Sequence, residues 1–292
     1  MESTEREGDE MARNPSHGSK RPQSESSGYA KAADGLEIHY EIHGEGEPIV
    51  VLAGALMPIK TMAQVIGPLS ERRQVIGIDL EGHGRTGLRE TPISHERNGD
   101  DVAAVLRHLG IATADVAGYS HGGDAAIRTA VQHADMVRNL IVIATGFARE
   151  AWYPEGQEGM SSISGSLAEQ MKSTPFFEGY GHPDQFPQFL DRMGELGSKD
   201  WDWREEVRNL SMLALLIYAD HDSVSMHHIA EFFALFGGGI QEPGWVDPHF
   251  SRGRLAIIPG YTHYNLIQGP EVARVIEGFL TQPTARATQF SP

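Results

Sequence analysis

Apolar side chains recur along the chain in short blocks, and the period of each block predicts a structural element. Residues 36–44 alternate apolar and polar side chains, which is the pattern of a half-exposed strand in an edge hairpin. Further runs are rich in β-branched residues and predict strands that are buried on both faces. These runs occupy residues 48–54, 73–80, the segment ending at Gly118, and residues 137–145, 212–220 and 254–260.

Helices are expected between these strands. The pattern predicts them at residues 98–110, 121–133 and 270–280. For the first helix, Asn98 is the expected cap and Gly110 the expected stop. Because buried strands alternate with helices, the chain is predicted to adopt an α/β fold, a mostly parallel sheet with helices on both faces.

The interval 147–205 departs from this alternation. It contains no convincing strand, is rich in aromatic residues and methionines, and is divided by Gly and Pro turns. We expect a helical cap, or lid, inserted over the carboxyl edge of the sheet; alternatively, most of these side chains simply pack a small core of their own. The core domain is then formed by residues 34–146 and 206–281, between a disordered polar tail (1–33) and a C-terminal tail (282–292).

Composition excludes several classes of function. Among 292 residues, 40 are acidic and 24 are basic, giving a formal net charge of −16. This charge argues against nucleic acid or an anionic membrane as a partner, since both require clustered Lys and Arg. No apolar run is long enough to span a bilayer, and the first thirty residues lack the apolar core of a secretory signal. The absence of cysteine excludes disulfides and thiolate chemistry, so a cytoplasmic location is favoured. The sequence leaves a homo-oligomer open.

One short motif carries candidate chemistry. The sequence Gly-Tyr-Ser-His-Gly, centred on Ser120, follows a predicted buried strand and opens a predicted helix. That is the setting of a nucleophile elbow, in which a serine is displayed on a sharp turn and Gly118 and Gly122 permit a close backbone approach. The alternative is an ordinary glycine-rich turn with a purely structural role. The choice between the two depends on whether Ser120 has catalytic partners.

A serine hydroxyl needs a base, and the base needs a carboxylate that orients it. In parallel sheets such groups gather in the loops that follow the strands' carboxyl ends. Asp220 and Asp222 come just after one predicted strand, and His263 comes just after the next. On this argument alone, either aspartate could be the carboxylate that orients the histidine.

Taken together, the motifs from about residue 34 to 281 resemble those of the α/β-hydrolase fold superfamily, in its esterase, lipase and haloperoxidase-like branch. Residues 78–86, IDLEGHGRT, are similar to the family's Asp-x-x-Gly-His-Gly segment, and residues 218–224 and 259–265 are similar to its acid and histidine loops. The resemblance implies a catalytic triad of Ser120, Asp222 and His263, with Asp222 favoured over Asp220.

The same resemblance implies an oxyanion hole formed by the backbone N–H groups of Ala55 and His121. The sequence departs from the family here, because Ala53-Gly54-Ala55 stands where a His-Gly pair is common. Backbone donors do not require that side chain, so the hole can survive its loss. His83 is expected to order its glycine-flanked turn rather than to react.

The expected function is a serine hydrolase that cleaves a small-molecule carboxylic ester through an acyl-enzyme, with no cofactor. No metal site is expected, because the histidines and aspartates between residues 220 and 249 lack a metal-binding spacing. A lactonase, a C–C hydrolase, an aminopeptidase or a cofactor-free perhydrolase would use the same triad. From another class, a hydrolase-like ligand-binding receptor with little turnover also remains open.

Overall fold

A single sheet organises the part of the chain that the computed structural model describes, residues 26–174, 177–244 and 250–281. Its eight strands lie in the order β1-β2-β4-β3-β5-β6-β7-β8; β2 is antiparallel to β1 and β4, and the pairs from β4 to β8 are parallel. The strands are β1 (Ser26–Lys31), β2 (Glu37–His43), β3 (Glu47–Leu52), β4 (Arg73–Ile78), β5 (Ala114–Tyr119), β6 (Val137–Ile143), β7 (Leu213–His221) and β8 (Gly253–Thr262). The predicted α/β fold is confirmed.

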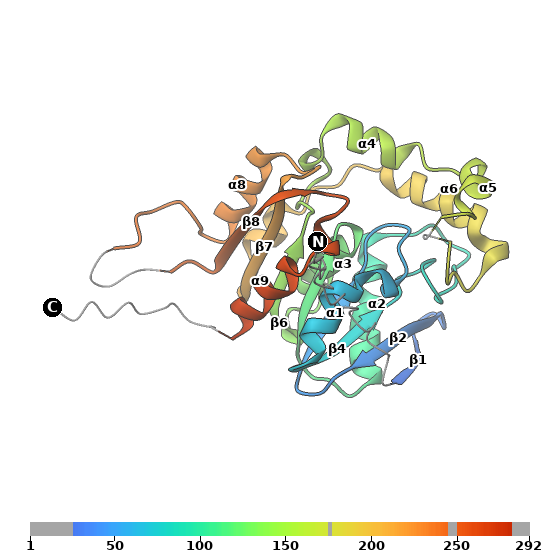
Figure 1. Cartoon of the computed structure of the whole chain (residues 1–292), viewed down its shortest axis with the longest axis horizontal. Coiled ribbons are helices and arrows are strands. Elements are labelled where there is room, and N and C mark those ends of the chain that lie inside the picture. Colours follow the sequence, from blue (N-terminus) through green and yellow to red (C-terminus); the bar gives the residue numbers. More distant parts are fainter. Residues whose placement is uncertain (1–25, 175–176, 245–249, 282–292) are drawn as a thin grey trace, which may run out of the picture.

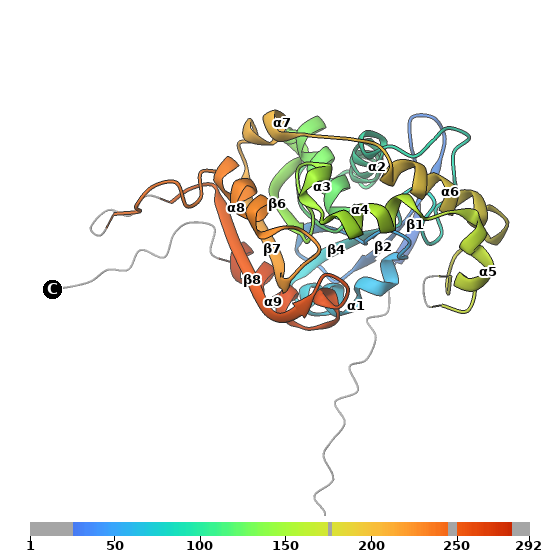
Figure 2. The same cartoon turned by 90° about the horizontal axis from the view of Figure 1, so that it is seen from above.

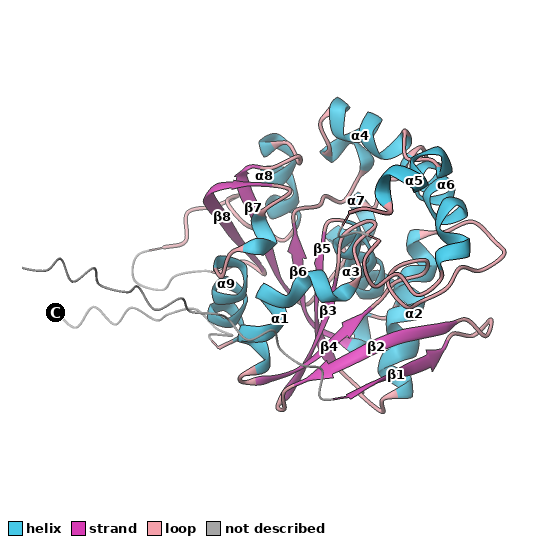
Figure 3. Ribbon diagram, turned by 45° about the vertical axis from the view of Figure 1, so that its right-hand side comes forward, coloured by secondary structure: helices cyan, strands magenta, loops and turns pink. Residues whose placement is uncertain are grey.

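Helices cover both faces of this sheet (Figure 3). On one side α2 (His95–His108) packs against α3 (His121–Gln132), with α7 (Arg204–Arg208) and α8 (Met226–Leu235) nearby. On the other side α1 (Ala63–Ser70) packs against α9 (Glu271–Leu280).

The sequence of β3 explains why both faces are covered. Ile49 and Val51 belong to the apolar cluster under α1 and α9, whereas Val50 and Leu52 belong to the cluster under α2 and α3. All four side chains are fully buried. Alternate residues of a strand point to opposite faces, so an unbroken apolar run requires a layer of helices on each side.

Cap helices lie between β6 and β7. They are α4 (Pro154–Ser161), α5 (Ala168–Met171) and α6 (Phe186–Gly197), seen along the upper side of the molecule in Figure 1 and across it in Figure 2. Most residues of α6 are buried, whereas α4 buries none of its residues.

The cap is fastened to the loop that follows β4. Arg192 of α6 donates hydrogen bonds to the carbonyl oxygens of Arg89 and Glu90. Phe186 and Phe189 pack with Ile93 in one apolar cluster, so the aromatic residues of α6 join the cap to the core domain.

Two expectations about the first elements are wrong. Residues 26–33 were assigned to a disordered tail, but Ser26–Lys31 forms β1, because its backbone pairs with β2 and Ala30 is fully buried. The helix expected from Asn98 begins at His95, since the hydroxyl of Ser94 accepts a hydrogen bond from the Arg97 N–H and caps it. Residues 1–25 of the predicted N-terminal tail, and residues 282–292, lie outside the described residues. Within the described ranges, no helix has the length and apolar character to cross a membrane.

Candidate active site

Ser120 occupies the turn between β5 and α3. Its φ is 52° and its ψ is −121°, a left-handed conformation that costs free energy for any residue other than glycine. The Ser120 N–H donates to the carbonyl of Ile143 on β6 at 2.8 Å, and α3 begins at the next residue. The turn therefore presents the serine at the amino end of a helix, where negative charge is favoured.

Glycines on both sides make this turn sterically possible. A Cβ at Gly118 would lie 1.9 Å from the carbonyl oxygen of Gly122, and a Cβ at Gly122 would lie 2.5 Å from that of Ala53. Both contacts are with backbone atoms, which cannot be relieved by rotating a side chain. Side chains are thus excluded from the points where β5, α3 and β3 meet.

The structure brings His263 and Asp222 together. His263 Nδ1 lies 3.0 Å from Asp222 Oδ1, and the two side chains are 7% and 1% exposed. Asp222 also accepts hydrogen bonds from the N–H groups of Ala219 and Val224. Because Nδ1 is engaged by the carboxylate, Nε2 is the ring nitrogen left for another partner.

Asp220 lies in a different environment. Its carboxylate accepts from the N–H of Gly260 and lies 3.0 Å from Nδ1 of His221, an exposed side chain. The interaction with His221 lowers the pKa of Asp220. It is Asp222, and not Asp220, that faces His263.

Two aromatic rings pack against His263, and one of them belongs to the serine turn. Tyr119, which precedes Ser120, stacks on the His263 ring with centroids 5.3 Å apart, and its hydroxyl donates to the His263 carbonyl at 2.5 Å. Trp152 of the cap segment meets the ring edge-on at 5.1 Å. In the described part of the chain, no hydrogen bond joins the Ser120 hydroxyl to His263.

The loop after β3 carries the first expected oxyanion donor. Neither the N–H of Ala55 nor that of His121 donates a hydrogen bond within the described residues, and both residues line one cavity together with Ser120. Leu56, next to Ala55, has a φ of 64° and donates its N–H to His83 Nε2 at 3.1 Å.

His83 thus does more than order its own turn. Since Nε2 accepts from Leu56, Nδ1 carries the proton and donates to the carbonyl of Glu81 at 2.9 Å. Burial, with the neighbouring His121 adding to it, lowers the pKa of His83 to about 3, so the ring is neutral. A neutral ring with a fixed tautomer can hold the loop of Ala55 from the β4 side. The Gly-His-Gly pattern signalled a structured turn, but it did not signal this contact.

The cavity beside Ser120 has two kinds of wall. The core domain contributes Ala55, Ser120 and His121, and two further polar residues, His95 and Asp124. Residues of the interval 147–205 contribute the rest: Arg149, Trp152, Gly156, Gln157, Met160, Leu196, Gly197 and Trp201. The inserted helices therefore enclose the space above the serine turn.

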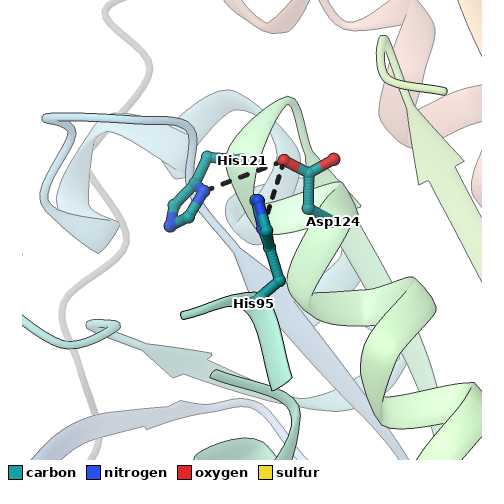
Figure 4. A group of neighbouring side chains, drawn as sticks. All are labelled: His95, His121 and Asp124. Atoms are coloured by element: carbon teal, nitrogen blue, oxygen red, sulfur yellow. Dashed lines mark ion pairs between the residues drawn. The ribbon is translucent and has the colours of Figure 1, made fainter. Parts of the chain in front are cut away.

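His95 and Asp124 were missed by sequence reasoning. Figure 4 shows both beside the His121 side chain. His95 stands on α2, 26 positions before His121, so no local spacing connects them; only the packing of α2 on α3 does. Burial lowers the pKa of His95 to about 4, which keeps its imidazole neutral.

Comparisons with known proteins support this architecture. A family model described as alpha/beta hydrolase fold matches residues 41–177. The chain is 27% identical over 226 residues to the AB hydrolase superfamily protein YisY of Bacillus subtilis, covering 70% of this chain and 84% of that protein. It is 25% identical over 259 residues to a pimeloyl-acyl-carrier-protein methyl ester esterase of Nitrosomonas europaea, covering 80% of this chain and 95% of the relative.

A solved structure is similar over nearly the whole described region. The enol-lactonase from Burkholderia xenovorans LB400 superposes with a TM-score of 0.65 at 22% identity, covering 87% of this chain and all of that one. At this identity the likeness concerns the fold alone.

The glycine contacts at the serine turn generate a stability prediction. Gly118→Ala places a methyl group against the Gly122 carbonyl, and we expect the free energy of unfolding to fall by about 1–3 kcal/mol or more. Urea denaturation followed by circular dichroism measures it. Gly278→Ala is the matched control: its Cβ meets nothing within 4 Å on helix α9, so alanine should be neutral or stabilise by up to about 1 kcal/mol. Equal stability of Gly118→Ala and wild type would contradict the steric argument.

Proposed function

The chain belongs to the α/β-hydrolase fold superfamily, and on this premise we propose that it is a serine hydrolase that cleaves a carboxylic ester through an acyl-enzyme. The observation that carries the proposal is the buried pair of His263 and Asp222 next to the strained turn of Ser120. A carboxylate on Nδ1 fixes the tautomer in which Nε2 can take a proton from a hydroxyl.

The mechanism assigns one role to each group. His263 Nε2 accepts the proton of Ser120 while the serine oxygen attacks the acyl carbon, and Asp222 stabilises the imidazolium that forms. The backbone N–H groups of Ala55 and His121 donate to the oxyanion. His263 then protonates the leaving alcohol, and water repeats the sequence on the acyl-enzyme to release the acid.

The open contact between Ser120 and His263 is compatible with this scheme, because nucleophile–base hydrogen bonds are often loose before substrate binds. The two residues are linked through Tyr119, which is bonded to the His263 backbone and adjacent in sequence to Ser120. On this proposal, a side-chain movement on substrate binding brings the Ser120 hydroxyl and His263 Nε2 into hydrogen-bond contact.

The lining of the cavity indicates which kind of substrate it suits. Trp152, Met160 and Trp201 offer apolar surface to an acyl or aryl group, and Arg149 and Gln157 offer polar contacts. The similarity to the methyl ester esterase of Nitrosomonas europaea favours a linear ester as the substrate of this chain. A cyclic ester is the second candidate, since a lactone is opened by the same steps of attack and acyl-enzyme hydrolysis.

Labelling of the serine tests the proposal. A fluorophosphonate probe should modify Ser120, as located by mass spectrometry, and Ser120→Ala should lower kcat on a p-nitrophenyl ester by roughly 10⁴–10⁶-fold. Ser162→Ala, a change at an exposed serine of the cap segment, is the control and should keep full activity. Modification elsewhere, or hydrolysis that survives Ser120→Ala, contradicts the assignment. Tight ligand binding with no turnover in the wild type would favour a receptor instead.

The two neighbouring aspartates provide a second, matched test. Asp222→Asn replaces the acceptor for His263 Nδ1–H and favours the wrong tautomer, so kcat should fall by roughly 10⁴-fold. Asp220→Asn changes a carboxylate that does not touch His263, and kcat should stay close to that of the wild type. Steady-state kinetics on both variants, with thermal unfolding to check their folding, decides the matter. A comparable loss of kcat in the two variants would contradict the proposal that Asp222 orients His263.

A further inference from the structure

Three side chains at the floor of the cavity have no part in the proposed hydrolysis. They are His95 at the start of α2, the imidazole of His121, and Asp124 in the first turn of α3. Nδ1 of each histidine lies 3.8 Å from the same oxygen, Oδ2 of Asp124, and all three residues are buried (Figure 4). The three ligand atoms lie within 4.8 Å of one another.

The remaining atoms of two of these side chains are already held. Oδ1 of Asp124 accepts a hydrogen bond from the Thr145 hydroxyl at 2.6 Å, so that Oδ2 is the free oxygen. Nε2 of His121 lies 3.1 Å from the Asn98 amide, whose Oδ1 is buried without a partner in the described residues. If that amide is turned, Oδ1 accepts the Nε2–H of His121, and Nδ1 is left with a lone pair that points at Asp124.

His95 independently indicates that a partner of these side chains is missing. Its Nδ1 is buried and has no hydrogen-bond partner within the described part of the chain, and its side chain is only 10% exposed. Trp201 and Trp203 pack against the ring with centroids 5.5 and 5.1 Å away, which fixes its orientation. A buried nitrogen left unpaired costs free energy, so an unoccupied arrangement is unfavourable.

Chemistry limits what can lie between these atoms. Separations of 3.8 Å are too long for direct hydrogen bonds. With Nδ1 of each histidine deprotonated, two nitrogen lone pairs and one carboxylate oxygen surround a space that suits a cation. Two imidazole nitrogens and one carboxylate are typical ligands of Zn²⁺ and similar first-row ions, and not of Mg²⁺ or Ca²⁺.

We propose that His95, His121 and Asp124 form a binding site for one divalent transition-metal ion, of which Zn²⁺ is the representative. The ligand–metal distances of such ions are about 2.0–2.2 Å, so a contraction of a few tenths of an ångström per side chain completes the site. Asn98 and Thr145 act as outer partners that orient two of the ligands. The cavity beside Ser120 provides the path of entry and leaves the remaining coordination positions open to water.

Direct metal binding tests this proposal without reference to hydrolysis. Chelator-treated protein is titrated with ZnCl₂ by isothermal calorimetry, and separately with Co²⁺, whose visible d–d absorption reports on coordination. We expect one ion per chain, and at least a tenfold loss of affinity in His95→Ala and in Asp124→Asn. Asp124→Asn is the conservative variant, because an amide oxygen can still accept from Thr145.

His221→Ala is the matched control, since His221 is an exposed histidine that also lies 3.0 Å from an aspartate. It should bind the ion as the wild type does. Absence of stoichiometric binding by the wild type, or unchanged affinity in both His95→Ala and Asp124→Asn, overturns the proposal. Loss of binding in His221→Ala overturns it as well, because the ion would then occupy the surface pair.

Discussion

The close approach of two backbones at Gly118 and Gly122 is the constraint on which the centre of the molecule depends. It lets α3 leave β5 at a sharp angle and forces Ser120 into a left-handed conformation. The same bend sets the free N–H of His121 at the helix start and the carboxylate of Asp124 one turn later. The close backbone approach therefore fixes the positions of the serine, of a backbone donor and of Asp124, which belongs to the group of His95, His121 and Asp124 (the His95 cluster).

The other groups of the candidate site lie on loops that follow neighbouring strands. Parallel strands end at a common edge, so the loops after β3, β4, β7 and β8 surround the serine turn. Their positions are secured by contacts between loops: Tyr119 holds the backbone of His263, and His83 holds that of Leu56. The second contact bears on the departure at Ala53-Gly54-Ala55, since the turn is braced from β4 even though its own histidine is absent.

Local pattern was sufficient to predict the parallel strands and the inserted helices, because unbroken apolar runs and a loss of alternation leave clear signals. It failed for β1, where a Ser-Ser-Gly sequence hides a strand that forms through pairing with β2. It also failed to indicate α1, which contains Pro68 and is held by the burial of Val65 and Ile66. Strand ends brought Asp222 and His263 into consideration, but the choice over Asp220 needed the family resemblance. The His95 cluster could not be predicted at all, since it exists only where two helices cross.

The unequal burial of the two cap helices has a consequence for the range of molecules that the cavity can admit. α6 is fixed to the core by its phenylalanines and by Arg192, whereas α4 exposes its outer face and buries none of its residues. Displacing α4 would uncover little apolar area, and displacing α6 would uncover a great deal. We therefore expect the part of the lining that α6 supplies to keep a constant shape while the part that α4 supplies yields, so that selectivity is strict beside α6 and permissive beside α4.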